Sequence, residues 1–271
     1  MGRVEAIFQD LRGSGRKALM PFICAGHPRP NATAEILRAL DKAGASIVEV
    51  GFPFSDPVAD GPIIAAAMHE SIRNGCTPGA VLDEVRAVRG ELSLGLIAMI
   101  SVSILHKLAS ASDPRQVANA FAQAGFDGFI FPDLPLEESE NWRAAAAEAG
   151  LTASLLISPS TPPERAQQIA RACTGFVYVL ARAGITGESG AMPDLSGRIG
   201  ELRRVTDLPL AVGFGVSSPE HVRHVVTSAD AAIVGSALVR RLSEVSPTES
   251  AAQVAGDFCR KLCSGLTEAR V

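Results

Sequence analysis

Eight short apolar runs recur along the chain, and longer segments with a helical spacing of apolar residues separate them. The runs are rich in Val, Ile, Leu and Phe and show little alternation with polar residues. Strands that are buried on both faces of a parallel sheet have this pattern. We therefore predict strands over Leu19–Cys24, Ile47–Val50, Leu94–Met99, Gly128–Phe131, Thr152–Ile157, Phe176–Leu180, Leu210–Val212 and Ala231–Val234.

The segments between the runs are predicted to be amphipathic helices. Several begin with a capping side chain beside a proline, as at Asp113-Pro114 and Ser218-Pro219, and Gly44 and Gly125 follow helical patterns as stop signals. The predicted helices span Ala32–Ala43, Gly79–Val88, Pro114–Ala124, Glu137–Ala149, Pro163–Ala172, Leu195–Val205 and Pro219–Val226, with further helices at Val4–Leu11 and Thr248–Leu262.

The alternation of eight strands with helices predicts a single (β/α)8 TIM barrel that covers residues 1–271 as one domain. The helix at Val4–Leu11 is an extra N-terminal element, expected to cover the barrel bottom. The length of 271 residues agrees, because this fold needs about 250 residues. Two long connections, Gly51–Gly61 and Ala181–Pro193, follow the second and sixth strands. They are expected on the C-terminal face of the barrel, where the active sites of this fold form.

Charge and composition exclude several functional classes. The net charge is −4 with no block of like charge, so no nucleic-acid surface is expected. The longest nearly uncharged apolar stretch, Leu94 to Leu105, is too short to span a bilayer and suits a buried strand. The N-terminus carries no apolar signal core, so a cytoplasmic protein is expected. Five scattered cysteines without a CxxC pair favour reduced thiols, and no metal site is expected.

Two carboxylates stand where the predicted strands meet the C-terminal face. Glu49 interrupts the apolar second run and is expected in or at the mouth of the barrel core, where burial raises its pKa and suits it to proton transfer. A structural carboxylate tied to an inner Lys or Arg is the alternative. Three prolines and two glycines stiffen the segment Gly51–Pro62. It presents Asp56 and Asp60, and the alternative role of Asp60 is to cap the helix that follows.

Glycine-rich turns follow the seventh and eighth strands, at Gly213–Ser217 and Gly235–Ala237. Glycine lets backbone N–H groups approach an anion, a helix N-terminus favours negative charge, and barrels frequently bind phosphate in these two loops. Two tight turns without a ligand are the alternative. After the sixth strand, Ala181–Gly190 contains three glycines, with Arg182 and Thr186 as donors. This loop is predicted to be a lid that excludes water, or otherwise a plain surface loop.

The run from Glu49 to Pro62, EVGFPFSDPVADGP, resembles the signature of the tryptophan synthase alpha chain family. Shorter motifs resemble that family in the same order, namely Pro21-Phe22, Pro132–Pro135, Arg182–Gly187, Gly213–Val216 and Val234–Ala237. The resemblance extends from about Val4 to the last predicted helix. It implies a carbon–carbon lyase of tryptophan biosynthesis, which cleaves indole-3-glycerol phosphate to indole and glyceraldehyde 3-phosphate.

The resemblance also assigns roles to residues. Glu49 matches the catalytic acid–base, and Asp60 matches the carboxylate that binds the indole N–H. The remaining matches bind substrate: Gly187, Gly215, Gly235 and Ser236 in the phosphate cradle, Phe22, Tyr178 and Phe214 in the indole pocket, and Thr186 in the lid. The family's partner is a beta subunit that carries pyridoxal phosphate. The resemblance therefore implies an α2β2 complex, with no cofactor in this chain.

Two segments depart from the family pattern. His27 stands where the family usually has Asp or Tyr. Met99–Ile104 has the sequence MISVSI, where the family has Met-Thr-Tyr-X-Asn-Pro. In the family this second segment adjoins the indole pocket and the face toward the beta subunit. We therefore expect the substitutions to alter contacts with the partner rather than the lyase chemistry.

Three alternatives to the alpha-subunit function stay open. One is a stand-alone lyase that releases free indole, which the altered segment Met99–Ile104 raises. Another is a catalytically silent barrel that binds a phosphorylated metabolite, against which the retention of Glu49 and Asp60 argues. The last is a sugar-phosphate isomerase, which explains the glycine-rich turns but not the run Pro53–Pro62.

Overall fold

The strands form a closed barrel. The computed structural model describes residues 2–57, 60–109, 113–181, 194–213, 215–246 and 248–266. In that part of the chain eight parallel strands pair in sequence order, and the last pairs with the first. The strands are β1 (Ala18–Cys24), β2 (Ile47–Gly51), β3 (Gly95–Met99), β4 (Gly128–Phe131), β5 (Thr152–Ile157), β6 (Val177–Leu180), β7 (Leu210–Gly213) and β8 (Ala231–Val234). The predicted (β/α)8 TIM barrel is confirmed, and each predicted strand boundary lies within one residue of the observed one.

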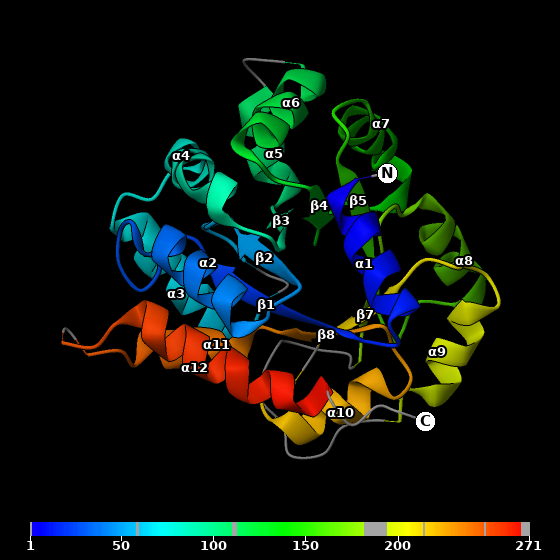
Figure 1. Cartoon of the computed structure of the whole chain (residues 1–271). Coiled ribbons are helices and arrows are strands. Elements are labelled where there is room, and N and C mark those ends of the chain that lie inside the picture. Colours follow the sequence, from blue (N-terminus) through cyan, green and yellow to red (C-terminus); the bar gives the residue numbers. More distant parts are fainter. Residues whose placement is uncertain are drawn as a thin grey trace.

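The helices surround the strands (Figure 1). They are α1 (Arg3–Gly13), α2 (Ala32–Ala43), α3 (Pro62–Arg73), α4 (Pro78–Val88), α5 (Val102–Ala109), α6 (Pro114–Ala124), α7 (Glu140–Glu148), α8 (Pro163–Ala172), α9 (Ser196–Arg203), α10 (Pro219–Val226), α11 (Ser236–Ser243) and α12 (Ala251–Cys263). Short 3-10 turns lie at Arg89–Glu91, Leu136–Glu138 and Ser264–Leu266. The nine predicted helices are present, and the one predicted from Glu137 begins as a 3-10 turn before α7.

Three observed helices, α3, α5 and α11, are not among the nine predicted ones, and α5 is the one that no local motif indicated. The apolar stretch Leu94–Leu105 was expected to suit a buried strand, but β3 ends at Met99 and α5 begins at Val102. Leu105 is fully buried in the same core that the outer faces of the strands supply. The strand β3 and the helix α5 both contribute apolar side chains to this core, so the sequence stays apolar from one element to the next.

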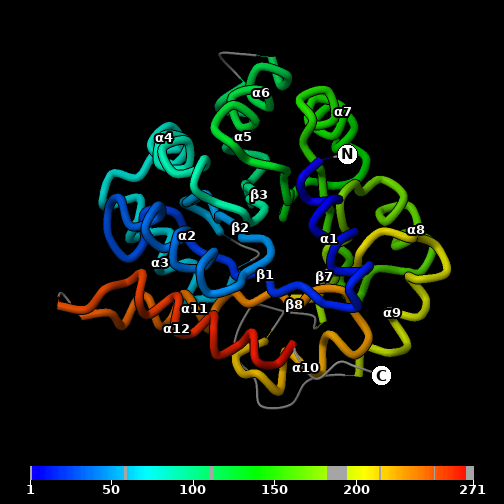
Figure 2. The backbone as a smooth tube through the Cα atoms, in the orientation of Figure 1, coloured from blue at the N-terminus to red at the C-terminus, as the bar shows by residue number. Residues whose placement is uncertain are grey.

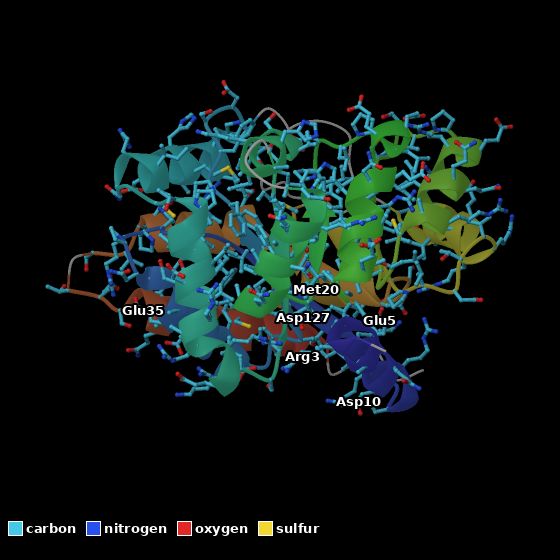
Figure 3. All side chains as sticks on the ribbon, turned by 90° about the horizontal axis from the view of Figure 1, so that it is seen from above. Arg3, Glu5, Asp10, Met20, Glu35 and Asp127 are labelled. Atoms are coloured by element: carbon cyan, nitrogen blue, oxygen red, sulfur yellow. The ribbon has the colours of Figure 1, made fainter. Side chains whose placement is uncertain are left out.

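Successive side chains of a strand enter two different cores. On β1, Leu19 and Ile23 face the helix layer, whereas Met20 faces the barrel interior. Phe8 of α1 joins the interior cluster, and its ring centre lies 6.1 Å from that of Phe176. Helix α1 thus closes the end of the barrel where the strands begin, as predicted. Figure 3 shows it against one end of the molecule, and Figure 2 shows it in front of the strand ends.

Candidate active site

Glu49 lies on the inward side of β2 and is fully buried. The parallel register places it beside Phe22 of β1 and Ile97 of β3. Among the described residues, neither of its carboxylate oxygens has a hydrogen-bond partner. Burial alone raises the pKa of Glu49 well above its usual range, because a buried charge loses its hydration. The alternative of an inner Lys or Arg that holds this carboxylate finds no support in the described side chains.

Two glycines make room for the aromatic walls of the site. A Cβ at Gly51 would lie 2.4 Å from Cζ of Phe22, and a Cβ at Gly213 would lie 2.6 Å from the hydroxyl oxygen of Tyr178. Any side chain at these positions would displace the rings. The contacts of Gly51 with Phe22 and of Gly213 with Tyr178 were not predicted, because they join strands that are adjacent in space but separate in the chain.

Tyr178 lies near both carboxylates of the site. Its side chain is buried, and burial raises its pKa well above the usual value, with further increases from the charges of Glu49 and Asp60. The phenol therefore stays protonated and can donate a hydrogen bond. The three predicted residues Glu49, Asp60 and Tyr178 are thus brought together by β2, the segment that follows it, and β6.

Asp60 is half-buried directly before α3. The N-cap of α3 is Gly61 and not Asp60, so the alternative role of Asp60 as the cap of this helix is wrong. Burial, and then the negative charge of Asp133, raise the pKa of Asp60 to about 6. At neutral pH Asp60 is consequently ionised, whereas the environment of Glu49 favours the protonated form.

Asp133 is a site residue to which the sequence analysis gave no role. Its carboxylate accepts hydrogen bonds from Ser101 Oγ at 2.5 Å and from the Val102 amide at 2.9 Å. It thereby holds the start of α5 in place. One pocket is lined by Asp60 and Asp133 together with Phe52, Phe54, Asp56, Pro57, Met68, Met99, Ser101 and Pro132. The altered segment after β3 is therefore part of the wall beside Asp60.

The glycine-rich turn after β8 meets the aromatic wall. Helix α11 begins at Ser236, and its N-cap Gly235 provides no capping side chain. A Cβ at Gly235 would lie 3.7 Å from Ile64 Cδ1 and 3.9 Å from Phe22 Cβ, which are ordinary contacts. Gly215 has φ 74°, a conformation that favours glycine. Because Gly235 brings no capping side chain to the first amides of α11, this helix end suits an anion such as phosphate.

Three predicted site residues, Thr186, Gly187 and Phe214, lie outside the described residues, as does most of the predicted lid. Within the described ranges, no group of three or more His, Cys, Asp or Glu side chains could hold a metal ion. In the same part of the chain, no helix is long and apolar enough to cross a membrane.

The arrangement combines three chemical capabilities. A buried carboxyl group without partners can hold a proton at neutral pH and release it to a substrate atom. A second carboxylate, ionised and half-buried, can stabilise positive charge that develops on a ligand. A helix N-terminus at the far side of the aromatic wall can bind an anionic group and fix the ligand's orientation.

Known proteins resemble this chain in both sequence and fold. The profile of the family described as "Tryptophan synthase alpha chain" matches residues 8–266. A tryptophan synthase alpha chain of Prochlorococcus marinus is 41% identical over 261 residues, which cover 96% of this chain and 93% of the relative. The alpha chain of Acaryochloris marina is 41% identical over 268 residues, with 98% of each chain covered.

Solved structures give the same result. The tryptophan synthase alpha subunit of Legionella pneumophila superimposes with a TM-score of 0.88 at 29% identity, and 98% of each chain is covered. A chain in a crystal structure of tryptophan synthase from Mycobacterium tuberculosis, in an aminoacrylate-bound form, superimposes with a TM-score of 0.86 at 30% identity. That match covers 98% of this chain and all of the other.

Proposed function

The chain belongs to the tryptophan synthase alpha chain family and has its lyase role in tryptophan biosynthesis, and we propose that Glu49 and Asp60 cleave indole-3-glycerol phosphate to indole and glyceraldehyde 3-phosphate. The observation that carries this assignment is the fully buried Glu49 carboxyl group, which has no partner among the described residues. A fold-supporting carboxylate would be paired with cations or amides. An unpaired one suits proton transfer.

The proposed reaction begins with proton transfer from Glu49 to carbon 3 of the indole ring. This step turns a poor leaving group into a cationic indolenine, which accepts electrons readily. Asp60, ionised above about pH 6, hydrogen-bonds the ring N–H and stabilises the positive charge. The Glu49 carboxylate then removes the proton of the side-chain hydroxyl. The carbon–carbon bond breaks, its electrons return to the ring, and indole and the aldehyde are released.

The remaining residues are proposed to bind the substrate. Phe22 and Tyr178 enclose the ring, and Gly235 and Ser236 hold the phosphate at the start of α11. Anchoring the phosphate keeps carbon 3 of the ring in register with Glu49, because binding energy at a remote group orients the reacting centre. Gly215 is proposed to complete the cradle together with Gly187, and Phe214 is proposed to complete the indole pocket. Gly187 and Phe214 lie outside the described residues. Thr186 is proposed to close the lid over Asp60.

Indole release from indole-3-glycerol phosphate tests the function directly. The purified chain is expected to produce indole and glyceraldehyde 3-phosphate in equal amounts. Production of an isomerised sugar phosphate, or binding of the phosphate ester without turnover, would contradict the proposal.

We further propose that the chain works in an α2β2 complex with a tryptophan synthase beta subunit, in the cytoplasm. Pyridoxal phosphate is expected in that partner and no cofactor in this chain. Pro53 and Asp56, which in the family face the beta subunit, are retained here, whereas the Tyr and Asn after β3 are replaced by Ser101 and Ser103. Each lost hydrogen bond weakens association by about 1 kcal/mol unless the partner supplies a substitute. The cognate beta subunit is therefore expected to bind better than a foreign one.

A stand-alone lyase is the second candidate, and the altered wall at Ser101 favours it. Ser101 is satisfied within the chain by Asp133, so this segment is complete without a partner. Titration with cognate and foreign beta subunits separates the candidates. Activation by the cognate subunit alone supports the complex with its changed contacts, and equal activation by both contradicts the claim of changed contacts. Substantial indole release without activation by either supports the stand-alone enzyme.

A further inference from the structure

His27 is a buried titratable side chain that the proposed chemistry does not use. It follows β1 on the C-terminal side of the barrel, and only 1% of its side chain is exposed. Its backbone amide donates to the Cys24 carbonyl at 3.2 Å, and the adjacent Gly26 amide donates to Thr33 Oγ1 at 3.0 Å. The loop that carries His27 is therefore fixed at two points.

The imidazole ring lies between two helices. Its Nδ1 is 3.1 Å from Glu70 Oε2 on α3, a close polar contact that does not meet hydrogen-bond geometry. Its Nε2 is 3.0 Å from Ser243 Oγ at the end of α11. The Ser243 hydroxyl also lies 3.0 Å from the Val239 carbonyl, so its proton can serve either acceptor. The ring thus links α3 to α11 through one contact on each nitrogen.

The opposite ends of these two helices carry the two ends of the proposed substrate site. Helix α3 follows Asp60 and Gly61, and α11 begins at the phosphate cradle. The helices pack against each other (Figure 1). Ile64 in the first turn of α3 and Val239 of α11 share one cluster with Phe22. A change in the spacing of the helices would therefore change the spacing between Asp60 and the phosphate cradle.

We propose that His27 is a positioning residue that sets the distance between the indole-binding carboxylate Asp60 and the phosphate cradle by tying α3 to α11. The inference rests on the proposed function, because a ligand must span both places for the distance to matter. A rigid, planar ring that contacts both helices fixes their separation better than a flexible side chain does. Misplacement by about 1 Å can reduce a rate a hundredfold.

Burial lowers the pKa of His27, and the charge of Glu70 opposes this change. The ring is therefore neutral at neutral pH, with one nitrogen as donor and the other as acceptor. A neutral ring matches its two neighbours, because Nδ1–H can face the carboxylate while Nε2 accepts from the hydroxyl.

Three ligands separate positioning from simple stabilisation. Indole occupies the ring pocket alone, and glycerol 3-phosphate occupies the phosphate cradle alone. A non-cleavable analogue, in which three saturated carbons join indole to phosphate, spans both. In His27→Ala the affinity for the analogue and kcat/KM for the substrate are expected to fall about tenfold to a hundredfold. The affinities for the two partial ligands are expected to change by less than about twofold, since each contacts one helix end.

Conservative variants and a matched control locate the effect. Ser243→Ala and Glu70→Gln each weaken one side of the link and are expected to give smaller losses in the same direction. His27→Gln keeps a polar group near the place of Nε2 and is expected to recover part of the analogue affinity. Ser71→Ala is the control, because Ser71 is buried on α3, donates to Ala67 of its own helix and lies 3.6 Å from Cys24 Sγ of β1, so its hydroxyl is not part of the link to α11. It should leave all three affinities unchanged.

The outcomes distinguish this inference from the proposed function. If the wild-type chain releases no indole, the proposed function fails. If the wild-type chain is active and His27→Ala weakens all three ligands equally, or none of them, the positioning role is overturned. A selective loss for the spanning analogue in a folded variant supports it.

Discussion

At the end of the barrel where the strands begin, Asp127 and Asp230 occupy equivalent places half a barrel apart. Asp127 precedes β4, its amide donates to the Leu96 carbonyl at 2.7 Å, and its carboxylate accepts from the Leu96 amide at 2.8 Å. Arg89 reaches the same carboxylate at 2.9 Å and donates to the Leu94 carbonyl at 3.0 Å. Each charged group is thus surrounded by partners.

Asp230 repeats this arrangement before β8. Its amide donates to the Leu210 carbonyl at 2.9 Å, and its carboxylate accepts from the Leu210 amide at 2.8 Å. Arg203 pairs with the carboxylate and donates to the Leu208 carbonyl at 3.0 Å. Lys17 adds a second cation at 3.6 Å. The repeat ties β3 to β4 and β7 to β8 with the same set of groups.

At the opposite end of the barrel, where the strands end, the carboxylates of the site are not surrounded by such partners. Glu49 has no partner among the described residues, and Asp60 has a neighbouring carboxylate, Asp133, that raises its pKa. The difference shows how one barrel separates stability from chemistry. Carboxylates paired with guanidinium groups and amides stabilise the strand ladder. The buried Glu49 instead retains its proton near neutral pH at a cost in stability, and Asp60 ionises only above about pH 6.

Replacement of Glu49 by Gln is expected to have the largest effect. The amide has the same shape but no transferable proton, so indole release should fall by at least about 10²–10⁴-fold. Because the folded pKa of Glu49 lies above its unfolded value, its contribution to stability is present at low pH and is lost as pH rises through the folded pKa. In thermal unfolding, the stability of Glu49→Gln relative to that of the wild type should therefore increase from pH 5 to pH 8. Near-native turnover in Glu49→Gln would sink the mechanism.

Replacement of Gly235 by Asp tests the phosphate cradle. A Cβ at this position meets only ordinary contacts among the described residues, and the aspartate brings a negative charge to the start of α11. Glycerol 3-phosphate affinity should fall about tenfold to a hundredfold, the range for lost hydrogen bonds to a charged group. Gly215→Asp is a poorer test, because φ 74° strains any side chain there. Unchanged affinity in calorimetry would place the phosphate elsewhere.

Replacement of Asp230 by Asn probes the stabilising end of the barrel. Loss of the charged hydrogen bonds should lower the free energy of unfolding by about 1–3 kcal/mol, while indole release per folded molecule stays unchanged. Burial acts to raise the pKa of Asp230, but the hydrogen bonds from Arg203 and Leu210, together with nearby cations, outweigh burial. The pKa of Asp230 therefore lies below its usual value. Its contribution is therefore complete at neutral pH and is lost as pH falls through the folded pKa. Denaturant unfolding at pH 7 and in acid measures the difference, and equal stability at pH 7 would contradict the pairing argument.

The sequence pattern predicted the barrel because each strand carries its own local signal. Strands buried on both faces are continuously apolar, and a charged residue such as Glu49 within one of them stands out against that background. Helix α5 has no such contrast with β3, since both are apolar, and its start depends on a hydrogen bond from Val102 to the distant Asp133. Periodicity within one segment does not contain that information.

The site likewise combines residues that a local motif identifies with contacts that only the fold creates. The motif from Glu49 to Pro62 identified both carboxylates, but the environment that sets their pKa values comes from other strands and loops. Gly213 matters because Tyr178 fills the space above it. His27 was visible as a departure from the family, yet its contact Ser243 lies 216 residues away in the chain. Contacts of this kind require the folded structure.

The smallest expected effect concerns the ionisation of Asp60. The carboxylate form is the one that stabilises the indolenine, so kcat/KM should rise with pH through about 6 as Asp60 loses its proton. In Asp133→Asn the neighbouring negative charge disappears, so the pKa of Asp60 falls and the acid limb of the profile moves to lower pH. The remaining carbonyl oxygen of the amide still accepts from Val102, which preserves the start of α5. Asp127→Asn is the matched control, because it removes a carboxylate at the opposite end and should leave the acid limb in place. An acid limb that stays fixed in Asp133→Asn, or moves equally in both variants, would show that the charge of Asp133 does not act on Asp60.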